Sequence, residues 1–114
     1  MRLPNAEQAI VDATKVRDYL LSATHPLGRA KARVFGALGF AAAESWRLAD
    51  ALRAHGAAGV AAAAGEGPYG RKYAVRGMLR GPTGRMMAVV SIRIVPPGST
   101  GPRLITAYPA EELP

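Results

Sequence analysis

The sequence contains no cysteine, and histidine and acidic residues are scarce. The absence of cysteine excludes disulfides, thiolate nucleophiles and metal sites built on sulfur. Only His25 and His55 are available as imidazole ligands, and few carboxylates lie near either of them in the sequence. A zinc site would need such carboxylates to complete its coordination. We therefore expect neither a bound metal nor a cofactor.

Long hydrophobic runs are also missing. The longest apolar stretches, 36–43 and 57–64, are far shorter than the roughly 20 residues that a membrane-spanning helix requires. No charged segment followed by an apolar segment opens the chain, so we predict no secretory signal and no membrane partner. We expect action in the cytoplasm, either of the producing cell or of a cell to which the protein is delivered. The length of 114 residues predicts one domain, 1–114.

Acidic residues are few and unevenly placed. The chain has 15 basic and 8 acidic residues, a formal net charge of +7 and a pI of about 10.6. No acidic residue lies between Glu66 and Glu111. Such a segment carries a positive field, and polyanions such as RNA are its natural partners. A compositional origin stays open, because arginine, alanine, glycine and proline are all abundant, as GC-rich coding would produce.

The first half of the sequence predicts helices. Hydrophobic spacing and capping residues indicate helices over about 12–22, 26–38 and 43–55. Gly39 and Gly56 are expected to end the second and third of these. A short strand over 8–11 is a weaker expectation. The buried side of the third helix is predicted to carry Trp46, Ala49 and Leu52.

The second half predicts an antiparallel sheet. A short strand is expected over 60–64, a hairpin of 71–80 and 85–95 around the turn Gly81–Gly84, and a last strand over 103–108. Alternation in 71–80 places Tyr73, Val75 and Leu79 inside and Lys72, Arg76 and Arg80 outside. The core side of the next strand is predicted to be Met86, Ala88, Val90, Ile92 and Ile94. The fold class is α+β, with two or three N-terminal helices followed by a three- to four-stranded antiparallel sheet.

Several short motifs carry a family resemblance. In order they are Leu3-Pro4-Asn5-Ala6, Asp18-Tyr19-Leu20-Leu21, His25-Pro26-Leu27-Gly28-Arg29-Ala30-Lys31-Ala32, Tyr69-Gly70-Arg71-Lys72-Tyr73, Gly81-Pro82-Thr83-Gly84-Arg85 and Pro102-Arg103-Leu104-Ile105-Thr106-Ala107-Tyr108-Pro109. Their order and spacing resemble a family of small bacterial domains classed as domain of unknown function 6883. The layout is similar to ribonuclease toxins of the barnase, EndoU, colicin and RelE class, whose active sites lie on the sheet. This resemblance implies RNA cleavage and an acidic immunity or antitoxin protein as partner.

Metal-independent RNA cleavage requires a base, an acid and cations beside the phosphate. His25 is the base candidate, because an imidazole titrates near pH 6.5. Arg76 is expected to hold phosphate, with Lys72 about 13 Å away on the same strand face. Lys31 follows His25 by six residues and is a substrate-binding candidate. Plainer roles stay open for all four, namely a capping histidine and solvated basic side chains.

The remaining site candidates lie on the predicted strands. Thr106 and Tyr108 share a face of the last strand, where a hydroxyl and a phenol could orient substrate or assist the leaving group; hydroxyls that cap a packed strand are the alternative. Ser91 and Arg93 are expected to extend the basic patch. His55 is interpreted as structural. The catalytic prediction is therefore His25, Arg76, Thr106 and Tyr108, and the substrate-binding prediction is Lys31, Lys72, Ser91 and Arg93.

Three function classes remain open on these residues. The first is a ribonuclease-like toxin or effector that cleaves RNA through attack of the ribose 2′-hydroxyl. The second is a catalytically silent module that binds RNA or an acidic partner protein through the basic sheet face. The third is an interaction subunit whose positive charge is incidental. Turnover of RNA separates the first from the second, and affinity for RNA separates the third from both.

Overall fold

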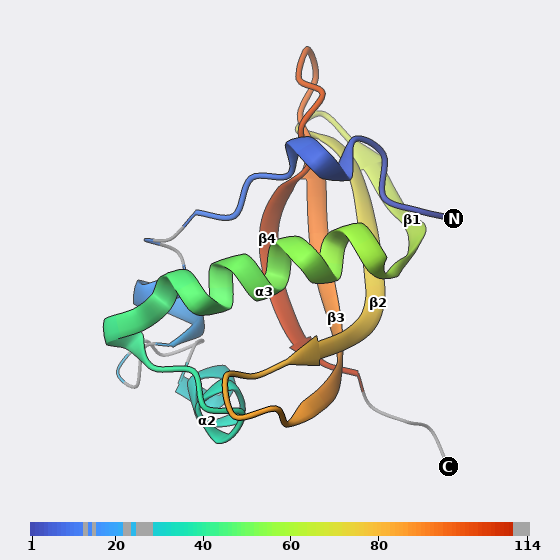
Figure 1. Ribbon diagram of the computed structural model, residues 1–114. Helices are drawn as coiled ribbons and strands as arrows, with labels where there is room; N and C mark the ends of the chain where they lie inside the picture. Colours follow the sequence, from blue (N-terminus) through green and yellow to red (C-terminus); the bar gives the residue numbers. More distant parts are fainter. Residues whose placement is uncertain (13, 15, 22–23, 25–28, 111–114) are drawn as a thin grey trace.

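Helical elements occupy the first half of the chain and an antiparallel sheet the second (Figure 1). The computed structural model describes residues 1–12, 14, 16–21, 24 and 29–110. The described strands form one four-stranded sheet in the order β1-β2-β3-β4, with every neighbouring pair antiparallel. The predicted α+β class is confirmed.

Two α-helices are described, and short helical turns surround them. The α-helices are α2 (Arg29–Ala37) and α3 (Ser45–Ala58). The turns are η1 (Ala6–Gln8), η2 (Val16–Leu20) and η3 (Ala42–Glu44). Of the helix expected over 12–22, the described residues with helical structure are Thr14 and the π-type turn η2. Helix α2 ends near the expected place, since Gly39 adopts a left-handed φ of 99° just beyond it.

Helix α3 departs from the sequence prediction at both ends. It runs through Gly56 to Ala58, and Gly59 closes it by donating its N–H to the His55 carbonyl at 2.9 Å. Ala49 and Leu52 are buried as expected, but Trp46 is 56% exposed, so its predicted place in the core is wrong. The Trp46 ring instead lies 5.3 Å from the guanidinium of Arg47, an arrangement that suits a half-solvated aromatic residue.

The strands occur in the predicted order; β1, β2 and β4 are longer than the sequence predicts, and β3 is one residue shorter. They are β1 (Val60–Gly67), β2 (Gly70–Arg80), β3 (Met86–Val95) and β4 (Arg103–Pro109). The tight turn between β2 and β3 is confirmed, because the Gly81 N–H donates to the Arg85 carbonyl at 2.8 Å and Gly84 has a φ of 88°. Strand β1 carries a bulge between Ala63 and Glu66.

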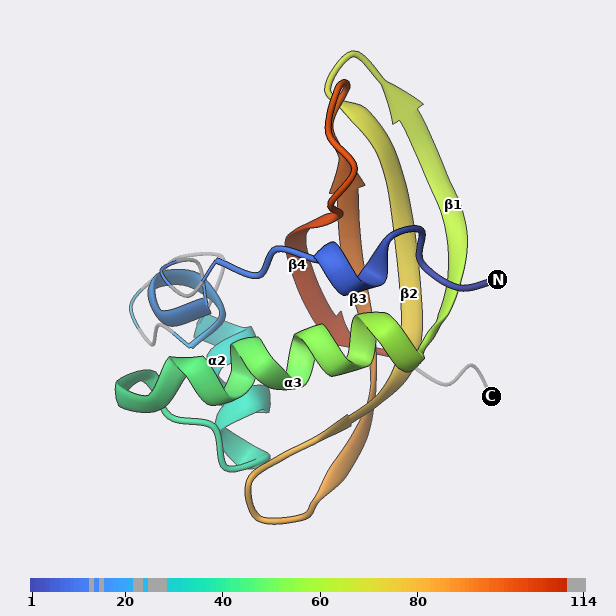
Figure 2. The ribbon, with the colours of Figure 1, turned by 45° about the horizontal axis from the view of Figure 1, so that its top comes forward.

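The core lies on the concave side of the sheet, where α3 crosses the strands (Figure 2). Leu48 and Leu52 of α3 and Phe35 of α2 belong to one buried cluster with Leu79 and Val89 of the sheet. The predicted alternation of β2 is confirmed. Its inward side chains Tyr73, Val75 and Leu79 are buried, and its outward side chains Lys72, Arg76 and Arg80 are exposed.

Strand β3 has the opposite parity to the one predicted. Val89, Ser91 and Arg93 are buried on the helix side of the sheet. The residues predicted as core are exposed or only half-buried on the other side; they are Met86, Ala88, Val90, Ile92 and Ile94. Both parities of β3 contain apolar residues, so alternation alone could not choose between them. The hydrogen bonds offered by α3 and the space beside it decide which set faces inward.

The N-terminal segment crosses the helix side of the sheet from one edge to the other (Figure 1). At the β1 edge, the Ala61 N–H donates to the Met1 carbonyl at 2.7 Å, and Leu3 is buried nearby. At the β4 edge, the Ile10 N–H donates to the Pro102 carbonyl at 2.8 Å. The strand expected over 8–11 is therefore reduced to one isolated parallel bridge between Ile10 and Arg103.

A pair of glycine substitutions tests how tightly α3 meets the sheet. A Cβ at Gly56 would lie 2.9 Å from Nη2 of the buried Arg93, whereas a Cβ at Gly36 in α2 meets nothing within 4 Å. We expect Gly36→Ala to raise the free energy of unfolding by about 0.5–1 kcal/mol, because alanine favours helix. We expect Gly56→Ala to lower it by about 1–3 kcal/mol through overpacking. Urea denaturation measures both, and stabilisation by Gly56→Ala would contradict the packing described.

Candidate functional site

The outward face of the sheet, on the side opposite α3, brings together side chains from three strands. The register aligns Arg76 of β2 with Val90 of β3 and Tyr108 of β4 in one row across this face. The neighbouring row is Ala74, Ile92 and Thr106. Adjacent strands lie about 4.8 Å apart, so the Cα atoms of Arg76 and Tyr108 are separated by about 10 Å. We call this surface the outward face.

Basic side chains border the outward face, and its centre is apolar. Arg76 and Lys72 are exposed, and Tyr108 is 39% exposed. The central residues on β3 are the half-buried Ala88, Val90, Ile92 and Ile94. Strands β2, β3 and β4 contain no aspartate or glutamate. The face therefore offers cations and an apolar floor without a carboxylate on these strands to neutralise them.

Lys31 reaches the outward face from helix α2. Its Nζ donates to the Thr106 Oγ1 at 2.6 Å, across 75 residues of sequence. Both side chains are half-buried. This contact places an ammonium group beside Thr106. Tyr108 is the next residue along β4 whose side chain lies on the same face. Four of the predicted residues on the face, Lys31, Arg76, Thr106 and Tyr108, thus come from α2, β2 and β4.

The predicted base, His25, lies outside the described residues, so its role stays a prediction from the sequence. Among the described residues of the outward face there is no imidazole and no carboxylate. The described groups can bind phosphate through Arg76 and Lys72, place an ammonium at Lys31 and offer the hydroxyls of Thr106 and Tyr108. They supply cations and hydrogen-bond donors, but no group that accepts a proton readily near neutral pH.

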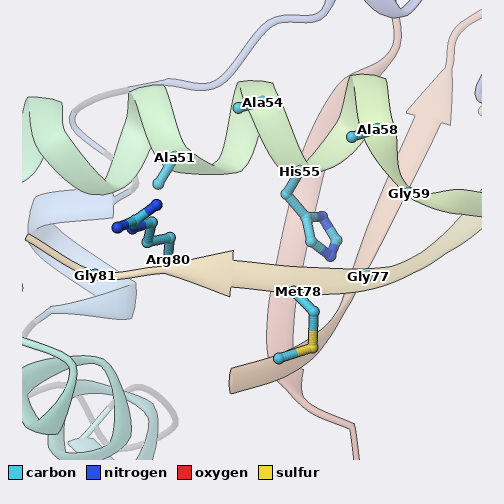
Figure 3. Close-up of a pocket in the computed structure, with 9 residues that line it drawn as sticks. All are labelled: Ala51, Ala54, His55, Ala58, Gly59, Gly77, Met78, Arg80 and Gly81. Carbon is cyan, nitrogen blue, oxygen red and sulfur yellow. The ribbon is translucent and has the colours of Figure 1, made fainter. Parts of the chain in front are cut away.

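Two cationic residues on or beside this face were not among the predicted site residues. Arg80 continues the alternation of Lys72 and Arg76, four positions further along β2; it is exposed, and its side chain extends from the strand edge toward Ala51 of α3 (Figure 3). Arg103 pairs with Ile94 at the start of β4 and is also exposed. The spacing of Arg80 was a usable signal in the sequence. The position of Arg103 depends on a register shift between β3 and β4, which alternation does not reveal.

Ser91 and Arg93 do not extend the basic patch. Both are fully buried on the helix side of the sheet, so their predicted place beside Lys72 and Arg76 is wrong. The guanidinium of Arg93 donates from Nη2 to the Leu52 carbonyl at 2.6 Å and from Nε to the Ser91 hydroxyl at 3.1 Å. These bonds to α3 and to its own strand hold the side chain inward. The two acceptors in the core offset part of the cost of removing the guanidinium from water.

A chain of hydrogen bonds links Arg93 to His55 inside the core. Nδ1 of the His55 ring lies 3.3 Å from the Ser91 Oγ, and Nε2 lies 3.0 Å from the Val89 carbonyl oxygen. A carbonyl only accepts, so we assign the proton to Nε2, and Nδ1 accepts from the Ser91 hydroxyl. The Ser91 oxygen in turn accepts from Arg93. This pattern uses a neutral ring and fits the structural role expected for His55.

Burial lowers the pKa of both groups. Desolvation lowers the pKa of Arg93 to about 10, which still leaves the guanidinium charged at neutral pH. Burial also lowers the pKa of His55 from its usual 6.5, and the Arg93 cation lowers it further. Backbone hydrogen bonds with Val89 and Gly77 oppose part of this shift. His55 is therefore neutral at neutral pH.

Two further observations concern metals and membranes. In the described part of the chain, no group of three or more histidine, cysteine, aspartate or glutamate residues is placed to hold a metal ion. Among the described helices, none is both long enough and apolar enough to cross a bilayer.

The family model for domain of unknown function 6883 matches residues 2–111. The chain belongs to this family. No curated protein matches the chain. The match covers nearly all of the described fold, including every strand that contributes to the outward face.

A solved structure is similar to this family member over almost its full length. It is described as a contact-dependent growth inhibition toxin and immunity protein complex from Klebsiella pneumoniae 342. The alignment covers 94% of this chain and 97% of that chain, with a TM-score of 0.62 and 23% sequence identity. At this level of identity the likeness shows a common fold.

The buried imidazole predicts acid sensitivity. Because the pKa of His55 is lower in the folded state, the unfolded chain binds more protons as the pH falls below 6.5. We expect the contribution of His55 to be fully present above that pH and to be lost on acidification, by at most about 1.4 kcal/mol per pH unit. Denaturant unfolding between pH 7 and pH 5 measures it. His55→Gln should flatten this pH dependence, and an equally steep slope in the variant would contradict the assignment.

Proposed function

We propose that the chain is an RNA-cleaving toxin domain whose outward face binds the RNA backbone. The observation that carries the proposal is the convergence of Lys31, Arg76, Thr106 and Tyr108 on one face, whose strands β2, β3 and β4 contain no acidic residue. The common fold with a chain from a toxin and immunity protein complex supports the toxin part. The proposal that the substrate is RNA is supported by the cationic and hydroxyl side chains of the face, which suit a phosphate backbone.

The proposed reaction needs no protein nucleophile. The 2′-oxygen of a ribose forms a bond to the adjacent phosphorus, and the bond from phosphorus to the 5′-oxygen of the next nucleotide breaks. His25 is the proposed base that removes the 2′-hydroxyl proton. Arg76 and Lys31 would hold the negative charge that gathers on the phosphate oxygens. Lys72, on the same face as Arg76, would bind a neighbouring phosphate.

The hydroxyl residues of β4 have separate proposed roles. Thr106 accepts a hydrogen bond from Lys31 and so positions the ammonium group beside the reacting phosphate. Tyr108 lies in the same row as Arg76. Its phenol would donate a proton to the leaving 5′-oxygen or its ring would stack on a base. The products would be a 2′,3′-cyclic phosphate and a 5′-hydroxyl.

A second candidate function is a silent module that binds RNA or an acidic protein through the same face. The apolar floor of Val90, Ile92 and Ile94 favours it, because apolar centres with charged rims are typical of protein interfaces. Under either function, an acidic immunity or antitoxin partner would be attracted to this face.

Matched arginine substitutions test the catalytic proposal. We expect Arg76→Ala to lower kcat/KM for a labelled single-stranded oligoribonucleotide by about 100-fold, because it removes one cation from the reacting phosphate. Arg47→Ala is the control. Arg47 is exposed on α3, where it pairs with Glu44 and lies against the Trp46 ring, so its loss removes the same charge from the far side of the sheet. Equal losses in the two variants would refute a specific role for Arg76.

The same assay separates the two candidate functions. An oligonucleotide with 2′-deoxyribose throughout should bind but resist cleavage, and EDTA should not slow the reaction. His25→Ala should abolish cleavage while leaving binding and the unfolding free energy near the wild-type values. If RNA survives prolonged incubation with the wild-type protein while still binding it, the enzyme proposal fails and the silent module stands.

Salt dependence tests whether the outward face binds phosphate at all. Four cationic side chains lie on or beside it, namely Lys31 of α2, Lys72 and Arg76 of β2 and Arg103 of β4. Each phosphate contact with a single strand releases about 0.7 counterions, so log K for the uncleavable oligonucleotide should fall against log salt with a slope of about −3. Arg76→Ala should make the slope shallower by about 0.7, and Arg47→Ala should leave it unchanged. If the protein does not bind the oligonucleotide even at low salt, the positive charge of the outward face has no role in RNA binding.

A further inference from the structure

We propose that an acidic partner protein docks by adding an extended strand to the open edge of β2 at 77–80, beside the groove between this edge and α3. The inference deepens the proposed function, since it states how the acidic partner of that proposal would attach. It concerns the open strand edge beside the outward face, and it can be tested without RNA.

The edge is open because β1 pairs with only part of β2. The pairing begins where Val60 lies opposite Arg76, and beyond that point β2 pairs with β3 alone. The hydrogen bond from Gly81 to the Arg85 carbonyl sets the phase of the β2–β3 ladder. Backbone groups alternate between the two sides of a strand, so those of Met78 and Arg80 point to the free side. In the described part of the chain no strand pairs with them there.

A groove of about 480 Å³ runs along this edge between β2 and α3. Figure 3 shows α3 above the strand, with the His55 ring between them near Gly77. The helix contributes small side chains to the wall, namely Ala51, Ala54 and Ala58. The groove thus leaves room beside the strand for the side chains of an added peptide. A stretch of four paired residues would cover about 13 Å of the edge.

Charge favours an acidic occupant over a second copy of this chain. Arg80 lines the groove, and Arg76 lies exposed at the point where β1 begins. Two copies joined edge to edge would place these arginines close to their counterparts, on chains that each carry a net charge of +7. An acidic strand would instead offer a carboxylate to Arg80 while its backbone pairs with Met78 and Arg80.

The other edges of the same sheet are partly covered or irregular. At the β4 edge, the Ile10 N–H donates to the Pro102 carbonyl and the Leu104 N–H donates to the Ile10 carbonyl, which covers the start of the strand. The β1 edge is held by Met1 near Ala61 and interrupted by the bulge after Ala63. Natural sheets protect their edges in these ways, and a regular stretch left open is a template for another strand.

The test uses a blocked octapeptide of alternating valine and glutamate as the probe. We expect it to bind the isotope-labelled protein and to slow amide hydrogen exchange at Met78 and Arg80 by about tenfold or more. Ala54→Glu should weaken binding by about tenfold or more, because it narrows the groove and adds a like charge. Ala57→Glu is the matched control: Ala57 is an exposed alanine of α3 outside the groove, and its variant should bind like the wild type.

Several outcomes would overturn the proposal. They are failure of the glutamate peptide to bind, equal binding of a valine and lysine peptide, no loss of affinity in Ala54→Glu, and protection confined to the outward face. A concentration-dependent dimer of the free protein that Ala54→Glu dissociates would assign the edge to a second copy instead. If the protein binds the peptide but does not cleave RNA, the docking proposal stands and only the proposed RNA cleavage is refuted.

Discussion

The buried guanidinium of Arg93 is the contact that determines how the helical half and the sheet fit together. It lies in the core with no exposure and is held by the Leu52 carbonyl of α3 and by Ser91. Taking a cation out of water is costly, and no carboxylate faces it among the described residues. The helix accommodates it with a glycine, since a Cβ at Gly56 would meet the guanidinium. Helix position, the buried histidine and strand parity all follow from this arrangement.

The parity of β3 in turn defines the candidate site. With Arg93 inward, the alternate residues Val90 and Ile92 must face outward, between the basic side chains of β2 and the hydroxyl residues of β4. If β3 were shifted by one residue, Arg93 would join the basic border and the apolar floor would move into the core. The core arginine therefore makes the outward face more apolar in its centre than a simple basic patch.

The sequence predicted the structure correctly where its local pattern was compatible with one arrangement only. Strand β2 alternates between large apolar and cationic residues, so Tyr73 and Arg76 were assigned to the correct faces. Strand β3 has apolar residues at both parities, and the more apolar set lies outward because the helix offers Arg93 a carbonyl and a space. Similarly, Gly56 resembles a helix end, yet α3 continues past it, since its role is to leave room for the guanidinium. The contact of Lys31 with Thr106 joins residues 75 apart, a separation that no local pattern encodes.

The outward face and the open edge of β2 are neighbouring parts of one surface. Arg76 belongs to the first and marks the beginning of the second, and Arg80 borders both. A strand added at the edge would lie about 4.8 Å from β2 and would continue the sheet in the direction away from β4. Its alternate side chains would point to the same side as the row of Arg76 and Tyr108. Acidic residues at those positions would neutralise the cations that phosphate needs, so edge docking and RNA binding would compete even though their backbone contacts are separate.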